Sequence, residues 1–104
     1  MDKILEIERD IVTALKSVYD PEIPVNVYDL GLIYKVDVDT DHNVEIDMTL
    51  TAPNCPMVDD LINDVQSAVR SIKDVRSVDV NIVFDPPWSK DFLSDEAKLD
   101  LGLL

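Results

Sequence analysis

The sequence has 104 residues, of which 46% are hydrophobic, and its formal net charge is −13 at neutral pH. We expect residues 1–104 to form a single globular domain, since this length and apolar content are typical of one. The excess of carboxylates argues against nucleic-acid and anionic-membrane partners, because Lys and Arg bind both. No apolar run approaches the roughly 20 residues that span a bilayer, and acidic residues interrupt the stretch where a signal peptide is apolar. These features predict a cytoplasmic protein.

Two segments, residues 3–18 and 57–72, show the apolar spacing of amphipathic helices. Residues 30–38, 44–50 and 76–84 alternate instead, which predicts strands with one buried face. The alternation assigns Tyr34 and Phe84 to buried faces and Thr49 to an exposed face. The remainder, residues 91–104, is expected to be a C-terminal tail with a short helix that Ser94 caps and Gly102 ends.

The predicted order is α-β-β-α-β-α. Helices packed on one face of a small three-stranded mixed sheet are the simplest way to cover three one-sided strands, so the fold class is α+β. The first two strands form an antiparallel hairpin, and the second helix makes the third strand parallel to the second.

Six prolines fall in three pairs, before the first strand, after the second and after the third. The predicted topology gathers these three loops at one end of the sheet. The only histidine, His42, lies in the hairpin turn, roughly 23 Å away at the other end.

Cys55 is the main candidate for chemistry. Pro56 suits the first position of a helix, which makes Cys55 the expected N-cap. Unpaired amide hydrogens at a helix start stabilise a thiolate, the form that attacks as a nucleophile and binds soft metals. A buried cysteine that only fills space is the alternative. With one cysteine in the chain, an internal disulfide is excluded.

A complete metal site is not visible in one chain, because an iron–sulfur cluster usually takes four protein ligands. Asp20, Glu22, Asp29 and Asp85 are weaker candidate ligands, and each is also typical of a loop turn or cap. A Cys–His catalytic pair is disfavoured by the distant position of His42.

The loop at residues 20–34 contains two prolines, which restrict its backbone, and Gly31, which permits a positive φ or a close backbone approach. It is either a well-packed connection or one wall of a shared site. Trp88 follows the third strand and either covers the core or anchors a partner. With two glycines in the chain, a Gly-rich phosphate-binding loop is excluded.

Three stretches together carry a family resemblance: DPEIPVNVYDLGLIY at 20–34, TLTAPNCP at 49–56 and FDPPW at 84–88. In their residues, order and separation they resemble the SufT/PaaD-like family of metal–sulfur cluster biosynthetic proteins. The resemblance covers roughly residues 5–102 and implies an iron–sulfur cluster assembly domain fold. The cysteine of the family's T-x-P-x-C-P motif falls on Cys55, and the acidic motif falls on Asp20, Pro21 and Glu22. The cysteine-containing C-terminal region expected of the PaaD branch is missing, which favours general assembly.

The resemblance implies an accessory factor, not an enzyme, in iron–sulfur cluster assembly or transfer. Cys55 would be a transient ligand of iron or of a cluster that is not stably bound, and a homodimer is one way to complete the ligand set. The alternative is an adaptor in which Cys55 is structural and the loops 20–31, 51–56 and 85–88 bind client or carrier proteins. A thiol enzyme ranks last because it lacks a visible base. The expected partner-binding residues are Pro21, Asn26, Asp29, Gly31, Thr51, Pro53, Pro56, Pro86, Pro87 and Trp88.

Overall fold

A computed structural model describes residues 3–20, 23–51 and 58–102 of the chain. The elements in chain order are α1 (Lys3–Leu15), β1 (Ile33–Val38), β2 (Asn43–Met48), α2 (Val58–Arg70), β3 (Ser77–Ile82), the short 3₁₀ helix η1 (Lys90–Phe92) and α3 (Asp95–Asp100). This order confirms the predicted α-β-β-α-β-α succession.

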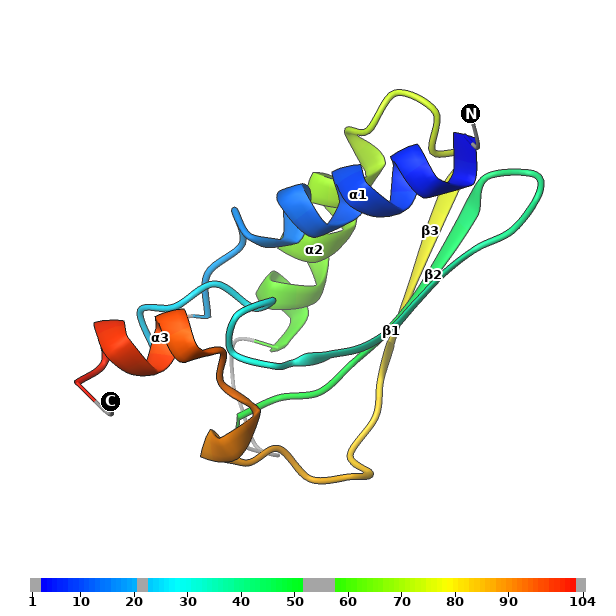
Figure 1. Cartoon of the computed structure of the whole chain (residues 1–104). Helices are drawn as coiled ribbons and strands as arrows, with labels where there is room; N and C mark the ends of the chain where they lie inside the picture. The colour runs from blue at the N-terminus through cyan, green and yellow to red at the C-terminus, as the bar shows by residue number, and fades with distance from the viewer. Residues whose placement is uncertain (1–2, 21–22, 52–57, 103–104) are drawn as a thin grey trace.

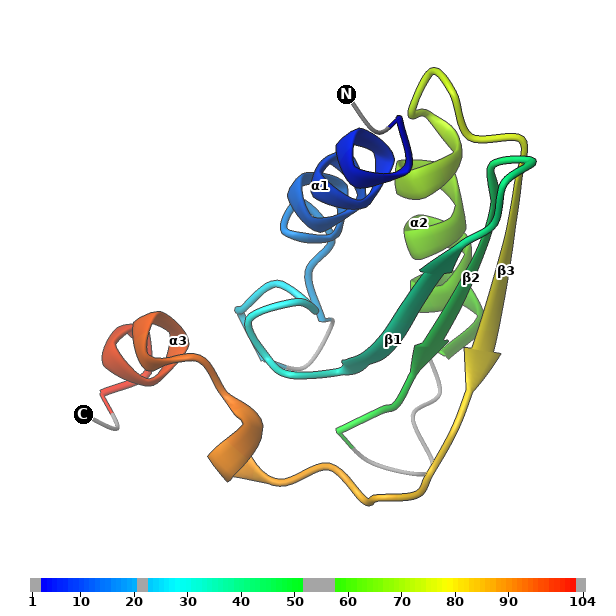
Figure 2. The same ribbon diagram turned by 45° about the vertical axis from the view of Figure 1, so that its right-hand side comes forward.

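The three strands form one sheet in the order β1-β2-β3. β1 pairs antiparallel with β2, and β2 pairs parallel with β3, as predicted. α1 and α2 lie on the same face of the sheet, while α3 lies to one side, beyond the loop that precedes β1 (Figures 1 and 2). The sheet is therefore mixed and covered by its two long helices on one face, which confirms the α+β class.

The core lies between that face and the two long helices. α1 contributes Ile7, Ile11 and Leu15, α2 contributes Leu61, Val65 and Val69, and the central strand contributes Val44, Ile46 and Met48. Burying one such side chain stabilises the fold by about 1.5–3 kcal/mol. The three- and four-residue spacing along each helix is what places all three of its buried residues on one face.

The prediction for the first strand is wrong in two respects: the strand begins later than expected, and the Tyr34 side chain does not point into the core. β1 starts at Ile33, because the chain turns at Gly31, whose φ is +78°. A bulge between Ile33 and Lys35 then shifts the pairing register against β2. An extra residue in one strand breaks the strict alternation of side chains. The Tyr34 ring consequently packs on Phe92, not in the core between sheet and helices.

Two further residues depart from the alternation near strand ends. Thr49, which follows β2, is predicted to be exposed but is 1% accessible, and it lies in the wall of one cavity together with Trp88 from the segment after β3. Phe84 was expected to be buried but is 53% exposed, because β3 ends at Ile82 and the chain leaves the sheet before Phe84. Alternation predicts burial only while the chain stays in the sheet.

The ends of the helices follow local hydrogen bonding. α1 ends at Leu15, earlier than the predicted 18, and the chain then forms a bridge between Tyr19 and Asn26. Ser94 caps α3 as predicted, with its Oγ accepting a hydrogen bond from the Ala97 amide at 3.1 Å. Gly102 follows this helix with a φ of +75°.

The hairpin turn between β1 and β2 is held by the carboxylate of Asp39. Its Oδ1 accepts hydrogen bonds from the Asp41 and Asn43 amides, each at 2.9 Å. These bonds, with the Asn43 amide first, lower the pKa of Asp39 below its ordinary value. The carbonyl of His42 accepts a hydrogen bond from the Arg76 amide at 2.9 Å, which ties the turn to the start of β3.

Candidate functional site

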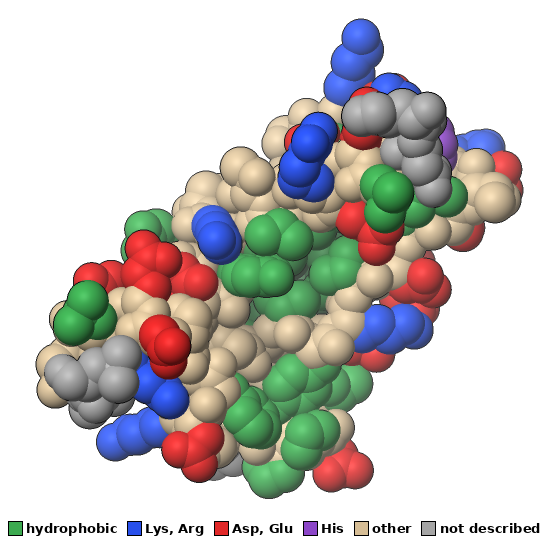
Figure 3. Space-filling model, viewed as in Figure 1, with side chains coloured by type: hydrophobic (Ala, Val, Ile, Leu, Met, Phe, Trp, Pro, Cys, Tyr) green, Lys and Arg blue, Asp and Glu red, His purple; other side chains and the backbone are tan. Residues whose placement is uncertain are grey.

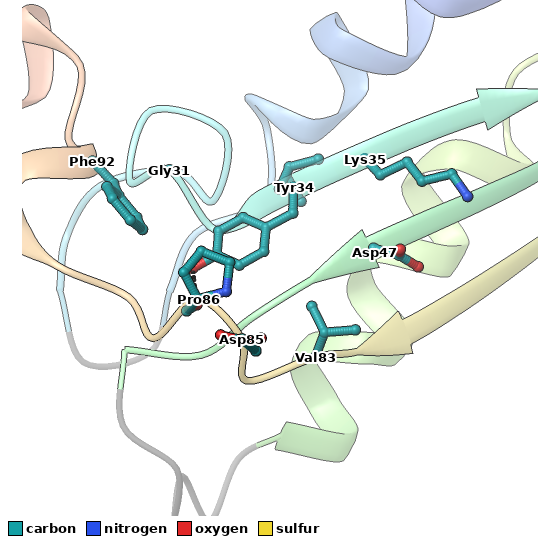
Figure 4. A pocket seen from close by; sticks show the side chains of 9 residues that line it. Gly31, Tyr34, Lys35, Asp47, Val83, Asp85, Pro86 and Phe92 are labelled. Atoms are coloured by element: carbon teal, nitrogen blue, oxygen red, sulfur yellow. Dashed lines mark hydrogen bonds between the residues drawn. The ribbon is translucent and has the colours of Figure 1, made fainter.

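The end of the sheet where β1 begins and β3 ends brings two of the predicted loops together. The indole Nε1 of Trp88 donates a hydrogen bond to the Leu30 carbonyl at 2.7 Å. The hydroxyl of Tyr34 donates to the Pro86 carbonyl, also at 2.7 Å, and Figure 4 shows its ring directed toward Pro86. These bonds fix the segment after β3 against the segment before β1.

The segment after β2 reaches the same end. Thr51 lines a cavity of about 220 Å³ together with Phe84, Pro87 and Trp88. The described parts of all three predicted loops therefore meet around Trp88, as predicted. His42 lies in the hairpin turn at the opposite end of the sheet, also as predicted.

Several predicted site residues lie outside the described residues. They are Pro21, Glu22, Pro53, Cys55 and Pro56. The predictions made for them stay predictions. Residues 20 and 51, which flank two of these stretches, are described, and Thr51 lies at the loop end of the sheet.

The acidic residues of the loop at 20–31 hold the loop itself. Asp20 is buried, and its Oδ1 accepts a hydrogen bond from the Ile23 amide at 3.1 Å. Asn26 and Asp29 bond reciprocally: the Asn26 side-chain amide donates to Asp29 Oδ2, and the Asp29 backbone amide donates to Asn26 Oδ1, both at 2.8 Å. Short polar side chains commonly stabilise turns in this way. Within residues 3–20, 23–51 and 58–102, no group of three or more His, Cys, Asp or Glu residues is arranged to hold a metal ion.

Gly31 is where the C-terminal tail packs against this loop. A Cβ at Gly31 would lie 2.4 Å from the Phe92 carbonyl oxygen and 2.7 Å from the Phe92 Cβ. Nearby, the Ser94 amide donates to the Asp29 carbonyl at 2.8 Å. The close approach predicted for Gly31 is thus to the chain's own tail, and residues 90–94 form part of the site's surroundings.

A second cavity, of about 670 Å³, opens beside this contact, and the sequence pattern did not predict it. Tyr34, Val83, Pro86 and Phe92 form much of its wall, as Figure 4 shows. The Tyr34 and Phe92 rings meet edge to face, with centroids 6.1 Å apart. The bulge that turns Tyr34 out of the core creates this wall, and alternation alone gives no signal for a bulge.

Charged side chains stand at the sheet side of the larger cavity. Lys35 and Asp47 line it, and Asp85 stands beside Pro86 (Figure 4). The Lys35 ammonium donates to Glu45 Oε1 at 3.0 Å, and this hydrogen bond raises the pKa of Lys35 above its ordinary value. Asp47 accepts a hydrogen bond from the Asn81 side chain at 3.2 Å.

Comparison with known proteins identifies the family of this chain. Residues 8–82 match the family described as iron-sulfur cluster assembly protein. The chain belongs to this family. A relative in Porphyromonas gingivalis, named Fe-S protein maturation auxiliary factor, is 56% identical over 99% of this chain and 98% of its own length. The Staphylococcus aureus relative named Fe-S protein maturation auxiliary factor SufT is 43% identical over 83% of this chain and 98% of its own length. The resemblance expected from the sequence is confirmed.

The same fold occurs in solved structures. The crystal structure of a domain of unknown function, DUF59, from Bacillus anthracis matches with a TM-score of 0.89 and 37% identity, covering 96% of this chain and 95% of that one. Longer proteins contain a similar segment: the iron-sulfur cluster carrier protein of Mycobacterium tuberculosis is 30% identical over 88% of this chain, which is 22% of its own length. In the described part of the chain, no helix is both long and apolar enough to cross a bilayer.

Proposed function

We propose that this protein is an accessory factor in iron–sulfur cluster assembly, or in transfer of clusters to client proteins, and that the Cys55 thiolate is a transient ligand of the cargo. Membership of the family supports a role in iron–sulfur cluster assembly. The observation that carries the proposal is that the described parts of the three motif-bearing loops meet at one end of the sheet, around Trp88. A cytoplasmic location fits this role.

The chemistry asked of Cys55 is ligation. A thiolate is a soft ligand suited to iron–sulfur clusters, and clusters usually take four protein ligands. The chain contains one cysteine, so a second protomer, a client or a small thiol supplies the others. A homodimer is one such arrangement, because a two-fold interface duplicates each residue. The cargo is held transiently, since one thiolate per chain gives an incomplete site.

The carboxylates are weaker ligands in this proposal. Asp20 is buried and bonded to the Ile23 amide, which suits a structural role in its loop. Glu22 remains a candidate beside it. The protein acts without catalysing a reaction, because a thiol enzyme needs a base near its nucleophile and His42 stands at the far end of the sheet.

Anaerobic reconstitution with ferrous iron and sulfide tests this function. Wild type, Cys55→Ser and Asp41→Ser are compared by visible absorption and by counting iron per chain; Asp41→Ser is a control on the exposed hairpin turn. We expect a chromophore in wild type and in the control and its loss in Cys55→Ser. Equal iron and absorption in wild type and Cys55→Ser would contradict ligation by Cys55.

An adaptor is the second candidate, and the exposure of Phe84 beside Trp88 favours it. A large aromatic side chain that is 53% exposed next to a partly buried tryptophan is a typical anchor for a protein partner. In this role, Phe84→Ser weakens binding to an iron–sulfur carrier protein and Cys55→Ser does not. Binding to the carrier that survives Phe84→Ser would contradict the adaptor role.

A further inference from the structure

The outer edge of β1 is open for pairing. β1 lies at one side of the sheet, and within the described residues its strand partner is β2 alone. The Asp39 amide donates a hydrogen bond to the Asn43 carbonyl at 3.1 Å, so Asp39 and Asn43 form a hydrogen-bonded pair of the β1–β2 ladder. Because hydrogen-bonded and non-bonded pairs alternate in an antiparallel ladder, Val36 and Val38 turn their backbone N–H and C=O groups away from β2.

Two cavities flank this edge and share the same strand residues. Ile33, Tyr34 and Lys35 line both the cavity of about 670 Å³ on the outer face of the sheet and a cavity of about 220 Å³ on the helix side. Glu8 and Val12 of α1, Tyr28 and Val36 form the rest of the wall on the helix side. Figure 3 shows hydrophobic side chains in a hollow below α1 and again lower down, toward the segment after β3.

An added strand would send alternate side chains into these two spaces. Successive residues of a strand point to opposite faces of its sheet. On the helix side, the added side chains would meet apolar groups, including Val12 and Val36. On the outer face they would pass Asp37 and Asp47, which lie on the exposed side of the sheet. The two sides of the edge therefore call for different chemistry.

Charge decides which occupant fits. The one cation on this stretch of β1, Lys35, is paired with Glu45, whereas Asp37 is exposed and Glu8 lines the helix-side cavity. With a net charge of −13, a second copy of the chain would bring like charges to the edge. A cationic segment meets complementary charge instead.

We propose that the β1 edge binds an extended segment of a partner protein by strand addition. The segment carries apolar side chains at alternate positions, directed to the helix side, and Lys or Arg between them, directed to the outer face. The bulge confines regular pairing to the short stretch Lys35–Val38, which limits indiscriminate strand pairing. Backbone hydrogen bonds supply affinity in this mode and the flanking cavities supply specificity. The identification of the partner as an iron–sulfur client or carrier rests on the proposed function, but binding of the segment does not.

Peptide titration with amide hydrogen exchange tests the proposal. The probe is a short capped peptide that alternates valine and arginine, and the comparison peptide alternates valine and glutamate. We expect the valine–arginine peptide to bind and to slow exchange of the Val36 and Val38 amides. Cys55→Ser should bind the peptide as wild type does, so that failure of cluster ligation and failure of strand addition are separate results.

Two charge reversals of equal size locate the contact. Asp37→Lys should weaken binding of the valine–arginine peptide about fivefold. The matched control, Asp64→Lys, changes an exposed residue of α2. This helix packs against β3, the strand at the opposite edge of the sheet from β1, so the control should leave affinity unchanged. No binding, or binding without protection of Val36 and Val38, overturns the proposal. Protection that rises with protein concentration in the absence of peptide overturns it in favour of a second copy.

Discussion

Replacing Gly31 by alanine tests how tightly the C-terminal tail is built onto the candidate site. Gly31 has a φ of +78°, and its missing Cβ would lie 2.4 Å from the Phe92 carbonyl oxygen and 2.9 Å from the Phe92 carbonyl carbon. Both of these atoms belong to the backbone, so a change of side-chain rotamer cannot relieve the overlap. Residues 90–92 have to move away from the loop at 28–31.

Gly102 provides a matched control. Its φ is +75°, nearly the same as that of Gly31, but a Cβ there would meet nothing within 4 Å. Left-handed geometry costs an alanine about 1 kcal/mol, and lower entropy of the unfolded chain offsets part of this at both positions. Overpacking adds about 1–3 kcal/mol at Gly31 alone. We therefore expect Gly102→Ala to destabilise the fold by about 1 kcal/mol or less, and Gly31→Ala to destabilise it by about 1–3 kcal/mol more than Gly102→Ala does.

Urea unfolding followed by circular dichroism measures both variants. The midpoint should fall for Gly31→Ala with little change in the dependence on urea, which indicates lost stability and not a changed unfolded state. A small domain with about 5–15 kcal/mol of stability tolerates this loss and stays folded. Equal losses for Gly31→Ala and Gly102→Ala would refute the close packing of the tail on the loop.

Two further substitutions test individual bonds. Trp88→Phe keeps a ring but removes the hydrogen bond from Nε1 to the Leu30 carbonyl, so it should lower the free energy of unfolding by about 1–2 kcal/mol in the same urea assay; no change would mean that this bond does not hold the loops together. Asp39→Asn should destabilise the hairpin at neutral pH, because the folded protein lowers the pKa of Asp39 below 3.8. The stabilisation by the carboxylate is present above that value and is lost as pH falls through the folded pKa, so unfolding curves of wild type and variant should converge in acid; a gap that persists unchanged would show that the charge of Asp39 is not what stabilises the turn.

The sequence predicts the elements well where a single period persists. α2 keeps its apolar spacing through its buried residues Leu61, Val65 and Val69, and β2 alternates without interruption, so their faces follow directly. The errors fall at strand ends and at the bulge of β1. Tyr34 is turned by the bulge, whereas Thr49 and Phe84 lie just beyond the ends of β2 and β3. Alternation along a strand signals neither a bulge nor the residue at which the strand ends.

The candidate site, too, could be predicted from the sequence only in part. Topology and proline positions predict that three loops meet at one end, and Trp88 does join the other loops there. The larger cavity beside Tyr34 escapes prediction, because it depends on the bulge and on the docking of the tail at Phe92. The one related signal in the sequence was Gly31: a glycine there indicated that another segment packs closely, but not that the segment is the tail at Phe92.

Cluster transfer to an apo iron–sulfur enzyme tests the central claim most directly. The acceptor is incubated anaerobically with iron and sulfide in the presence of wild type, Cys55→Ser or no added factor, and its regained activity is followed over time. We predict that wild type speeds activation and that Cys55→Ser behaves like the sample without a factor. Activation by Cys55→Ser at the wild-type rate would contradict a ligand role for Cys55.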